Sequence, residues 1–233
     1  MSERPPYEGP FDVLPWPSAL TARVVTPGAR PRLHGYDCED DLARHTSMSE
    51  ALLLSLTGEL PTEARARAFE IAVAFLAPVA VNEAPSHAAV LARLCQGTPS
   101  AILGTAAIAL AEEARFAVAR LADAWQWLGA PTAEVPAAIR AADDDERESV
   151  GRLRELLGAA GLRVAALGHD VARIPAIVAA LIACGLARPH QVEGAWVVAR
   201  LPVAFAEAMA ETPGNLRAYP ANLPPFRYEE GAP

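Results

Sequence analysis

Lysine is absent from the chain, so all 20 of its basic side chains are arginine, against 28 acidic ones. The resulting net charge of -8 argues against a nucleic-acid surface, because such a surface needs a concentrated basic patch to displace counterions. We therefore expect no nucleic-acid partner. The exclusive use of arginine indicates a GC-rich coding bias rather than a function.

Cysteine is scarce as well. Cys38, Cys95 and Cys184 lie far apart in the sequence and fit neither a zinc-binding spacing nor a disulfide framework. The simplest expectations are a reducing compartment and no metal site. Residues 1–10 are rich in proline and charge, without the apolar segment of a secretory signal, and no long uncharged apolar run predicts a membrane span. We expect a cytoplasmic protein that does not enter a membrane.

Aromatic residues make up only 6% of the chain, whereas alanine and leucine dominate. This composition favours helices over strands. Because 52% of the 233 residues are hydrophobic, the chain can bury a large core, as one large or two modest domains. The predicted fold class is all-α.

Local signals place the helices. Ser47 followed by Glu50 has the spacing of a capping box, and Gly58 and Pro61 mark the end of the helix that this box starts. Pro202 should interrupt or bend the last helix, because proline lacks an N–H and clashes with the preceding turn. The further helices are predicted at residues 64–77, 85–96, 100–128, 147–158, 171–184 and 190–211.

Two segments allow more than one interpretation. Residues 101–110 are almost wholly small and apolar, which predicts a helix buried on all sides, at the centre of the fold or of a dimer. The acidic run from Asp143 to Glu146 precedes the helix at 147–158, where it can cap the helix or bind a metal ion. Capping is favoured, because consecutive aspartates at a helix start point in different directions.

A series of short motifs occupies both ends of the chain. The motifs are Gly35 to Asp37, Asp41 to Ala43, Glu50 to Leu54, Gly58 to Pro61, Ser86 to Arg93, Ala199 to Pro202 and Tyr228 to Gly231. In their order and residue types they resemble the citrate synthase family, especially its short citryl-CoA lyase-like members, over about two thirds of the sequence.

The resemblance implies a domain plan. Residues 33–128 and 170–211 would form a large helical domain, with a reduced small domain at 129–169 between them. Residues 1–32 would be an extended arm, which wraps a partner or packs on its own domain, and 212–233 an extended tail. We expect a homodimer, because leaving so apolar a helix as 101–110 uncovered would be costly, and an intimate heterodimer with a complete homologue would cover the same surface. The resemblance agrees, since the corresponding helix of the family packs at the subunit interface.

The family chemistry joins or separates an acyl-CoA and a 2-oxo acid at a carbon–carbon bond, so a CoA thioester is the implied co-substrate, without a tightly bound cofactor. An aspartate and two histidines do this work in the family. The place of one histidine falls near residues 113–117, with Arg115 about where it should stand, and the place of another is taken by Asn82. The aspartate has no counterpart. His169 follows a glycine as a family histidine does, but at the wrong spacing, so it is a weak candidate for a relic or a working acid.

Two arginines remain as candidates for substrate binding. Arg200 keeps its family context, and Arg217 can stand for an arginine that the family contributes across the dimer. A planar guanidinium grips a carboxylate through two parallel hydrogen bonds, so a dicarboxylate or tricarboxylate is the implied ligand. For Arg200 a structural ion pair is an equal alternative.

Three functions follow from this pattern. The first is a divergent acyltransferase or lyase of the citrate synthase type that uses replacement groups. The second is a pseudoenzyme that serves as a partner or regulatory subunit of an active homologue. The third is a binding protein for a carboxylate or an acyl-CoA. Because the catalytic histidines and aspartate are not found, we expect the ordinary activity to be lost.

Overall fold

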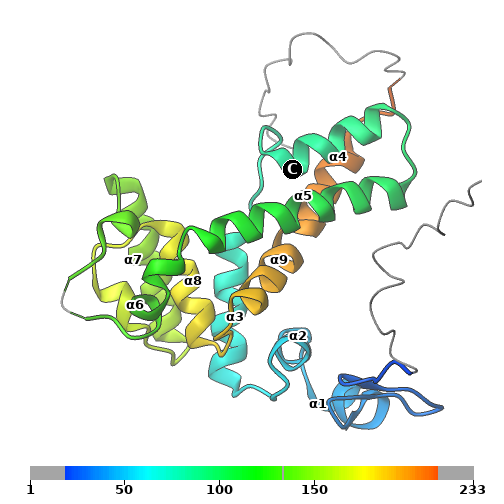
Figure 1. The fold of residues 1–233 in the computed structure, drawn as a ribbon, viewed down its shortest axis with the longest axis horizontal. Coiled ribbons are helices and arrows are strands. Elements are labelled where there is room, and N and C mark those ends of the chain that lie inside the picture. The colour runs from blue at the N-terminus through cyan, green and yellow to red at the C-terminus, as the bar shows by residue number, and fades with distance from the viewer. Residues whose placement is uncertain (1–18, 133, 215–233) are drawn as a thin grey trace, which may run out of the picture. The chain divides into compact units, whose positions relative to one another are not determined.

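The computed structural model describes residues 19–132 and 134–214, which form two compact units divided between Thr46 and Ser47 (Figure 1). The first unit contains a small antiparallel sheet of three two-residue strands in the order β1-β2-β3. These strands are followed by a π-helical turn, η1, and one turn of α-helix. The elements are β1 (Val25–Thr26), β2 (Arg32–Leu33), β3 (Tyr36–Asp37), η1 (Cys38–Leu42) and α1 (Ala43–His45).

Asp37 ends the sheet and starts η1. Its buried carboxylate accepts hydrogen bonds from the backbone N–H groups of Asp40, at 2.9 Å, and Glu39, at 3.0 Å. These bonds favour the ionised form and hold the pKa of Asp37 below its ordinary value. One carboxylate thus satisfies two backbone donors at the start of the turn.

The described part of the second unit is built of helices joined by loops, with one isolated β-bridge between Arg140 and Val171, which confirms the predicted all-α class. The capping box of Ser47 and Glu50 is present, and Gly58 ends that helix in the left-handed conformation, at φ 83°. The α-helices of the second unit are α2 (Met48–Thr57), α3 (Glu63–Leu76), α4 (Ala84–Leu94), α5 (Pro99–Ala119), α6 (Trp125–Gly129), α7 (Asp144–Ala159), α8 (Arg173–Ala183) and α9 (Pro189–Ala210).

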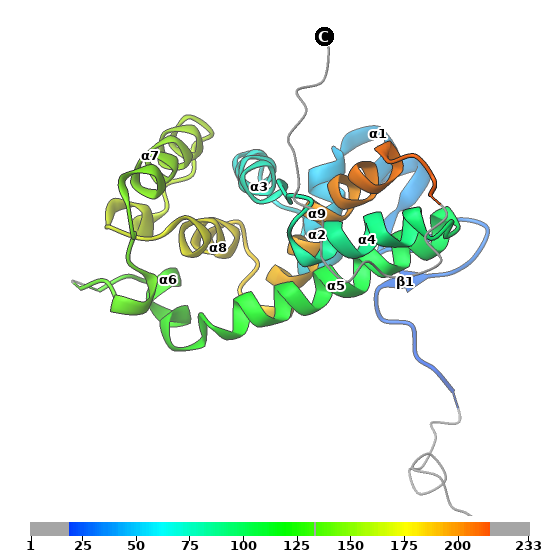
Figure 2. The same cartoon turned by 90° about the horizontal axis from the view of Figure 1, so that it is seen from above.

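The second unit has two hydrophobic clusters. In the larger, α8 lies among α3, α6 and α7, and its central turns are fully buried. In the smaller, α4, α5 and α9 lie side by side, as Figure 2 shows from above. They pack on one another through small side chains such as Ala89, Ala106 and Ala204. Alanines let helix backbones approach closely, and this second cluster positions the site described below.

The prediction of one helix over residues 100–128 is wrong in its last third. The helix α5 ends at Ala119, and a short 3-10 turn (Ala122–Ala124) leads into α6. No glycine or proline marks this break in the sequence. The turn brings Leu121 and Leu128 into the larger cluster, at 6% and 2% exposure, so tertiary packing decides the break.

The expectation that 101–110 is buried on all sides is also wrong within one chain. Ile102, Ala106 and Leu110 are fully buried against α4 and α9, but Leu103 and Ile108 on the same helix are 40% and 71% exposed.

The last helix is not interrupted at Pro202. The helix α9 continues through this proline to Ala210. Among the described residues, no helix combines the length and apolar character needed to cross a membrane.

Candidate functional site

Arg200 is a buried arginine on α9, with only 7% of its side chain exposed. Its Nη1 donates a hydrogen bond to Oε1 of Glu113. Its Nη2 donates to Oε2 of Glu83, at 2.6 Å, and to the carbonyl oxygen of Pro78, at 2.8 Å. The Nε atom is buried and has no hydrogen-bond partner among the described residues. The guanidinium is therefore held mainly by carboxylates of its own chain.

Three segments meet at this guanidinium. Pro78 follows α3, Glu83 precedes α4 and Glu113 lies on α5. Glu83 is fixed from its other side, because its Oε1 accepts a hydrogen bond from the backbone N–H of Ala80 at 2.6 Å. The cluster thus joins the turn between α3 and α4 to both long helices of the smaller hydrophobic cluster.

Trp196 lies one turn before Arg200 on α9 and completes the arrangement. Its indole N–H donates to Oε1 of Glu113 at 2.8 Å, and its ring centroid lies 5.7 Å from Cζ of Arg200. Glu113 therefore accepts from two donors of the same helix, while the guanidinium is attracted to the indole ring. We call Glu83, Glu113, Trp196 and Arg200 the Arg200 cluster.

The cluster contains the structural ion pair that the sequence analysis gave as one alternative for Arg200. A ligand carboxylate would have to compete with two internal carboxylates, both of which are close and partly shielded from water. One guanidinium against two carboxylates also leaves one negative charge uncompensated. In this arrangement the guanidinium of Arg200 binds carboxylates of its own chain and is not a free cation.

Two of the predicted site residues lie beside the cluster without joining it. Asn82 is exposed in the turn directly before Glu83. Arg115 is exposed on α5, where its Nη2 pairs with Glu112 at 2.7 Å. The two segments in which family histidines were expected therefore do converge on Arg200, but through the neighbouring residues Glu83 and Glu113.

The sequence reasoning missed the roles of Glu83, Glu113 and Trp196. One local signal was available, because Trp196 and Arg200 are spaced four residues apart and thus share a helix face. For the two glutamates no such signal existed. They are 117 and 87 residues away from Arg200, so only the packing of α4, α5 and α9 brings them together.

The remaining predicted residues lie elsewhere. His169 precedes α8, and its ring packs edge-on against Trp127 with the ring centroids 5.3 Å apart. His169 lines a small cavity beside α7 that includes no member of the Arg200 cluster. Arg217 and the motif at 228–231 lie outside the described residues.

Comparison with known proteins gives a likeness of fold to solved structures. Neither a protein-family model nor a curated protein matches the chain. Among solved structures, citryl-CoA lyase from Hydrogenobacter thermophilus superimposes with a TM-score of 0.63 over 90% of this chain and 97% of the other. The fold of this chain is that of citryl-CoA lyase. The sequences are 17% identical, so the likeness establishes the fold and leaves the chemistry open.

Two ATP citrate lyases share the citryl-CoA lyase fold with this chain. The enzyme from Methanosaeta concilii, in complex with (3S)-citryl-CoA, has a TM-score of 0.59 at 10% identity. The enzyme from Methanothrix soehngenii, in complex with citrate and coenzyme A, has a TM-score of 0.58 at 13% identity. In both cases the match covers 93% of this chain but only 43% of the longer one.

Proposed function

We propose that the chain is a non-catalytic protein of the citrate synthase and citryl-CoA lyase type, which serves as a partner or regulatory subunit. The observation that carries this proposal is the occupation of Arg200 by two carboxylates of its own chain. In the family that the sequence resembles, arginines grip the carboxylates of the 2-oxo acid. Here Glu83 and Glu113 take the place of such a ligand.

The chemistry of the Arg200 cluster supports this proposal. Removing a proton from an acyl-CoA methyl group needs a base, and the enolate that forms needs a hydrogen-bond donor. An ionised carboxylate accepts hydrogen bonds and donates none, so neither Glu83 nor Glu113 stabilises an enolate oxygen. The uncompensated negative charge of the cluster also repels an anionic 2-oxo acid.

The proposed partner contacts the chain through the exposed apolar side of α5. Ile108 and Phe116 are 71% and 61% exposed there. Gly104 lies one turn before Ile108 on the same face, and a Cβ atom on it would meet no atom of the chain within 4 Å. Large exposed side chains beside a small residue suit close approach of another helix. The partner is a second copy of this chain or an active homologue of the same fold.

The experiment that tests the loss of activity measures thiol release from acetyl-CoA with oxaloacetate and other 2-oxo acids, and cleavage of citryl-CoA. The purified chain is assayed alone at high concentration beside an active citryl-CoA lyase. We expect no turnover above the heat-inactivated chain while the control enzyme works. Turnover by the chain alone, lost in Arg200→Ala, would replace this proposal with a divergent acyltransferase or lyase.

A second candidate function is the binding of a dicarboxylate, a tricarboxylate or an acyl-CoA without chemistry. The buried, unpartnered Nε of Arg200 favours it, because this donor has no acceptor among the described residues. Isothermal titration with citrate tests it. Saturable binding by the wild-type chain that disappears in Arg200→Ala, but not in Arg115→Ala, supports this function. If citrate does not bind, the role as a partner or regulatory subunit remains the proposed function.

A further inference from the structure

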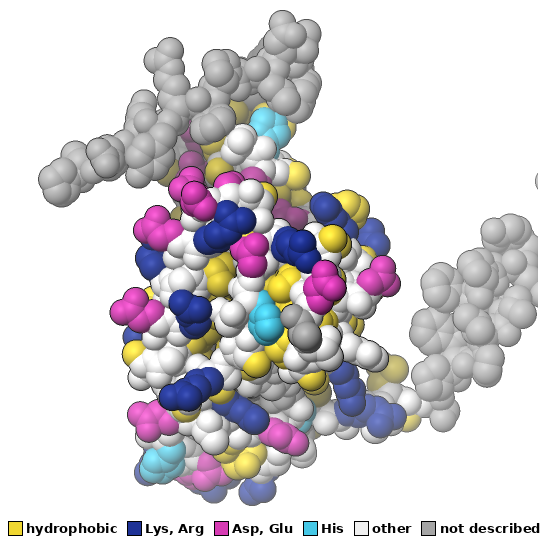
Figure 3. Space-filling view, turned by 90° about the vertical axis from the view of Figure 1, so that its left-hand side faces the viewer, with side chains coloured by type: hydrophobic (Ala, Val, Ile, Leu, Met, Phe, Trp, Pro, Cys, Tyr) yellow, Lys and Arg dark blue, Asp and Glu magenta, His cyan; other side chains and the backbone are white. Residues whose placement is uncertain are grey.

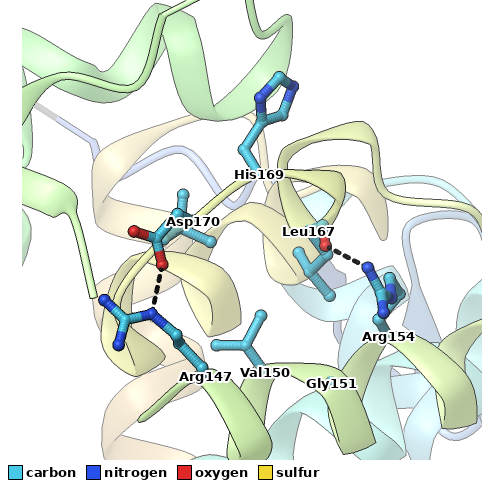
Figure 4. A pocket seen from close by; sticks show the side chains of 8 residues that line it. Arg147, Val150, Gly151, Arg154, Leu167, His169 and Asp170 are labelled. Atoms are coloured by element: carbon cyan, nitrogen blue, oxygen red, sulfur yellow. Dashed lines mark hydrogen bonds and ion pairs between the residues drawn. The ribbon is translucent and has the colours of Figure 1, made fainter. Parts of the chain in front are cut away.

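A cavity of about 80 Å³ lies beside α7, outside the Arg200 cluster. One wall is the face of α7 that carries Arg147, Gly151 and Arg154, and the other is the segment from Leu167 to Val171 (Figure 4). The ring of His169 points away from the two arginines. The cavity is large enough for a group of the size of phosphate or a carboxylate.

The two arginines of this cavity differ in how they are satisfied. Arg147 is bound by Asp170 through Nε and by Asp144 through Nη1, each at 2.9 Å. Arg154 has no carboxylate partner among the described residues, and its one hydrogen bond is to the carbonyl oxygen of Leu167 at 3.4 Å. Arg154 therefore retains most of its five N–H donors and an uncompensated positive charge.

Gly151 keeps space open next to Arg154. It lies in the interior of α7, where glycine costs about 1 kcal/mol relative to alanine. A Cβ atom at this position would meet no atom of the chain within 4 Å, so nothing in the chain itself requires glycine. Residues 151 and 154 are three apart and thus neighbours on one face of the helix.

The charges of the lining residues favour a single anion. Arg147, Arg154 and Asp170 are the charged residues that line the cavity. Arg147 is already paired with Asp170 and with Asp144, which lies outside the lining, so Arg154 is the lining cation without a carboxylate partner among the described residues. On the surrounding surface basic and acidic side chains are interspersed (Figure 3), which does not suit an extended polyanion. A small oxyanion needs only the local donors, and a guanidinium offers them as a planar fork.

We infer that the cavity between α7 and residues 167–171 binds one small oxyanion, a phosphate group or a carboxylate, through Arg154. The inference does not depend on the proposed function, because it concerns neither the Arg200 cluster nor the exposed side of α5. A bound oxyanion would account both for the N–H donors of Arg154 that have no partner among the described residues and for the presence of glycine at position 151.

The test is a titration of the ¹⁵N-labelled full chain with inorganic phosphate and, separately, with acetate, at an ionic strength held constant with NaCl. Matched ionic strength removes general screening effects. We expect saturable shifts of the amide signals of Gly151, Leu167 and Val171 with at least one anion. Saturable shifts with phosphate alone, or with acetate alone, identify which oxyanion the site binds, and either result supports the inference.

Two variants and a control make the titration specific. Arg154→Gln should weaken binding about tenfold or more, because it removes charge-assisted hydrogen bonds. Gly151→Ala should weaken binding by filling the cavity while leaving the chain folded. Arg152→Gln, on the same helix but outside the cavity, should bind as the wild type does. Absence of saturable shifts with both anions, or equal binding by Arg154→Gln, would overturn the inference.

Discussion

The carboxylate of Glu83 lies 2.6 Å from Nη2 of Arg200, although 117 residues separate the two in the chain. This contact ties the start of α4 to the middle of α9. Because Arg200 also holds Glu113 on α5, one side chain links all three helices of the smaller hydrophobic cluster. The Arg200 cluster is therefore positioned to stabilise the fold.

Replacing Arg200 by alanine should destabilise the chain by about 2 to 4 kcal/mol. Removing one member of a buried ion pair costs about 3 to 5 kcal/mol, and we expect less here because the side chain of Glu83 is 40% exposed. Urea unfolding at pH 7 measures the change. Arg115→Ala is the matched control, since its ion pair with Glu112 is exposed to solvent and contributes little to stability.

The same variant separates the two interpretations of Arg200. If Arg200→Ala unfolds at the same urea concentration as the wild type but loses citrate binding, the arginine is a ligand site. In that case the structural ion pair is the wrong interpretation. A destabilised variant that binds citrate no differently from the wild type supports the ion pair.

Replacing Ile108 by glutamate should break the proposed dimer. Ile108 is 71% exposed on α5, so a charge there costs little in one chain but would be buried in an interface. Sedimentation velocity should show a dimer for the wild type and a monomer for Ile108→Glu. Leu156→Glu, at a position on α7 that is 47% exposed, should leave the dimer intact.

A wild-type chain that is monomeric by itself would exclude the homodimer. The heterodimer then predicts that mixing with a homologue of the same fold produces a 1:1 complex. Ile108→Glu should fail to form that complex. Persistence of either assembly in the variant would show that the exposed side of α5 is not the interface.

The acidic run from Asp143 to Glu146, at the start of α7, should act as a cap and not as a metal site. Asp143 accepts a hydrogen bond from the backbone N–H of Glu146, and the Glu146 carboxylate accepts one from that of Ala142, each at 2.9 Å. Asp143→Ala should therefore cost about 1 kcal/mol in urea unfolding, and Asp145→Ala only a few tenths. Millimolar calcium should leave the melting temperature unchanged, and a rise that Asp143→Ala abolishes would argue for a metal site.

Cys95 and Cys184 should differ in reactivity. Burial raises the pKa of the Cys184 thiol to about 12, whereas Cys95 is exposed. At pH 8 a disulfide reagent should modify Cys95 rapidly and Cys184 only after unfolding, because the thiolate is the reactive form. Mass spectrometry of the modified peptides identifies which thiol reacted. Modification of Cys184 as fast as Cys95 in the folded chain would contradict its burial.

The raised pKa of Cys184 also predicts a loss of stability at high pH. Folding keeps the thiol neutral, so its contribution is complete below its ordinary pKa of 9.0 and is lost as the pH rises toward about 12. Urea unfolding across this range should show a smaller decline in Cys184→Ala than in the wild type. An equal decline in both would assign the loss to other groups.

Local sequence rules determined much of the secondary structure. The capping box of Ser47 and Glu50 and the left-handed Gly58 act within a few residues, so they can be recognised from the sequence alone. The abundance of alanine and leucine likewise determined the all-α class, because these side chains favour helices wherever they pack.

Only the tertiary structure decided where α5 ends and what Arg200 binds. The break after Ala119 has no local signal and exists because the following residues gain burial in the larger cluster. Glu83 and Glu113 reach Arg200 through the close packing of α4, α5 and α9. Contacts of this kind depend on three helices at once, and no spacing within one helix specifies them.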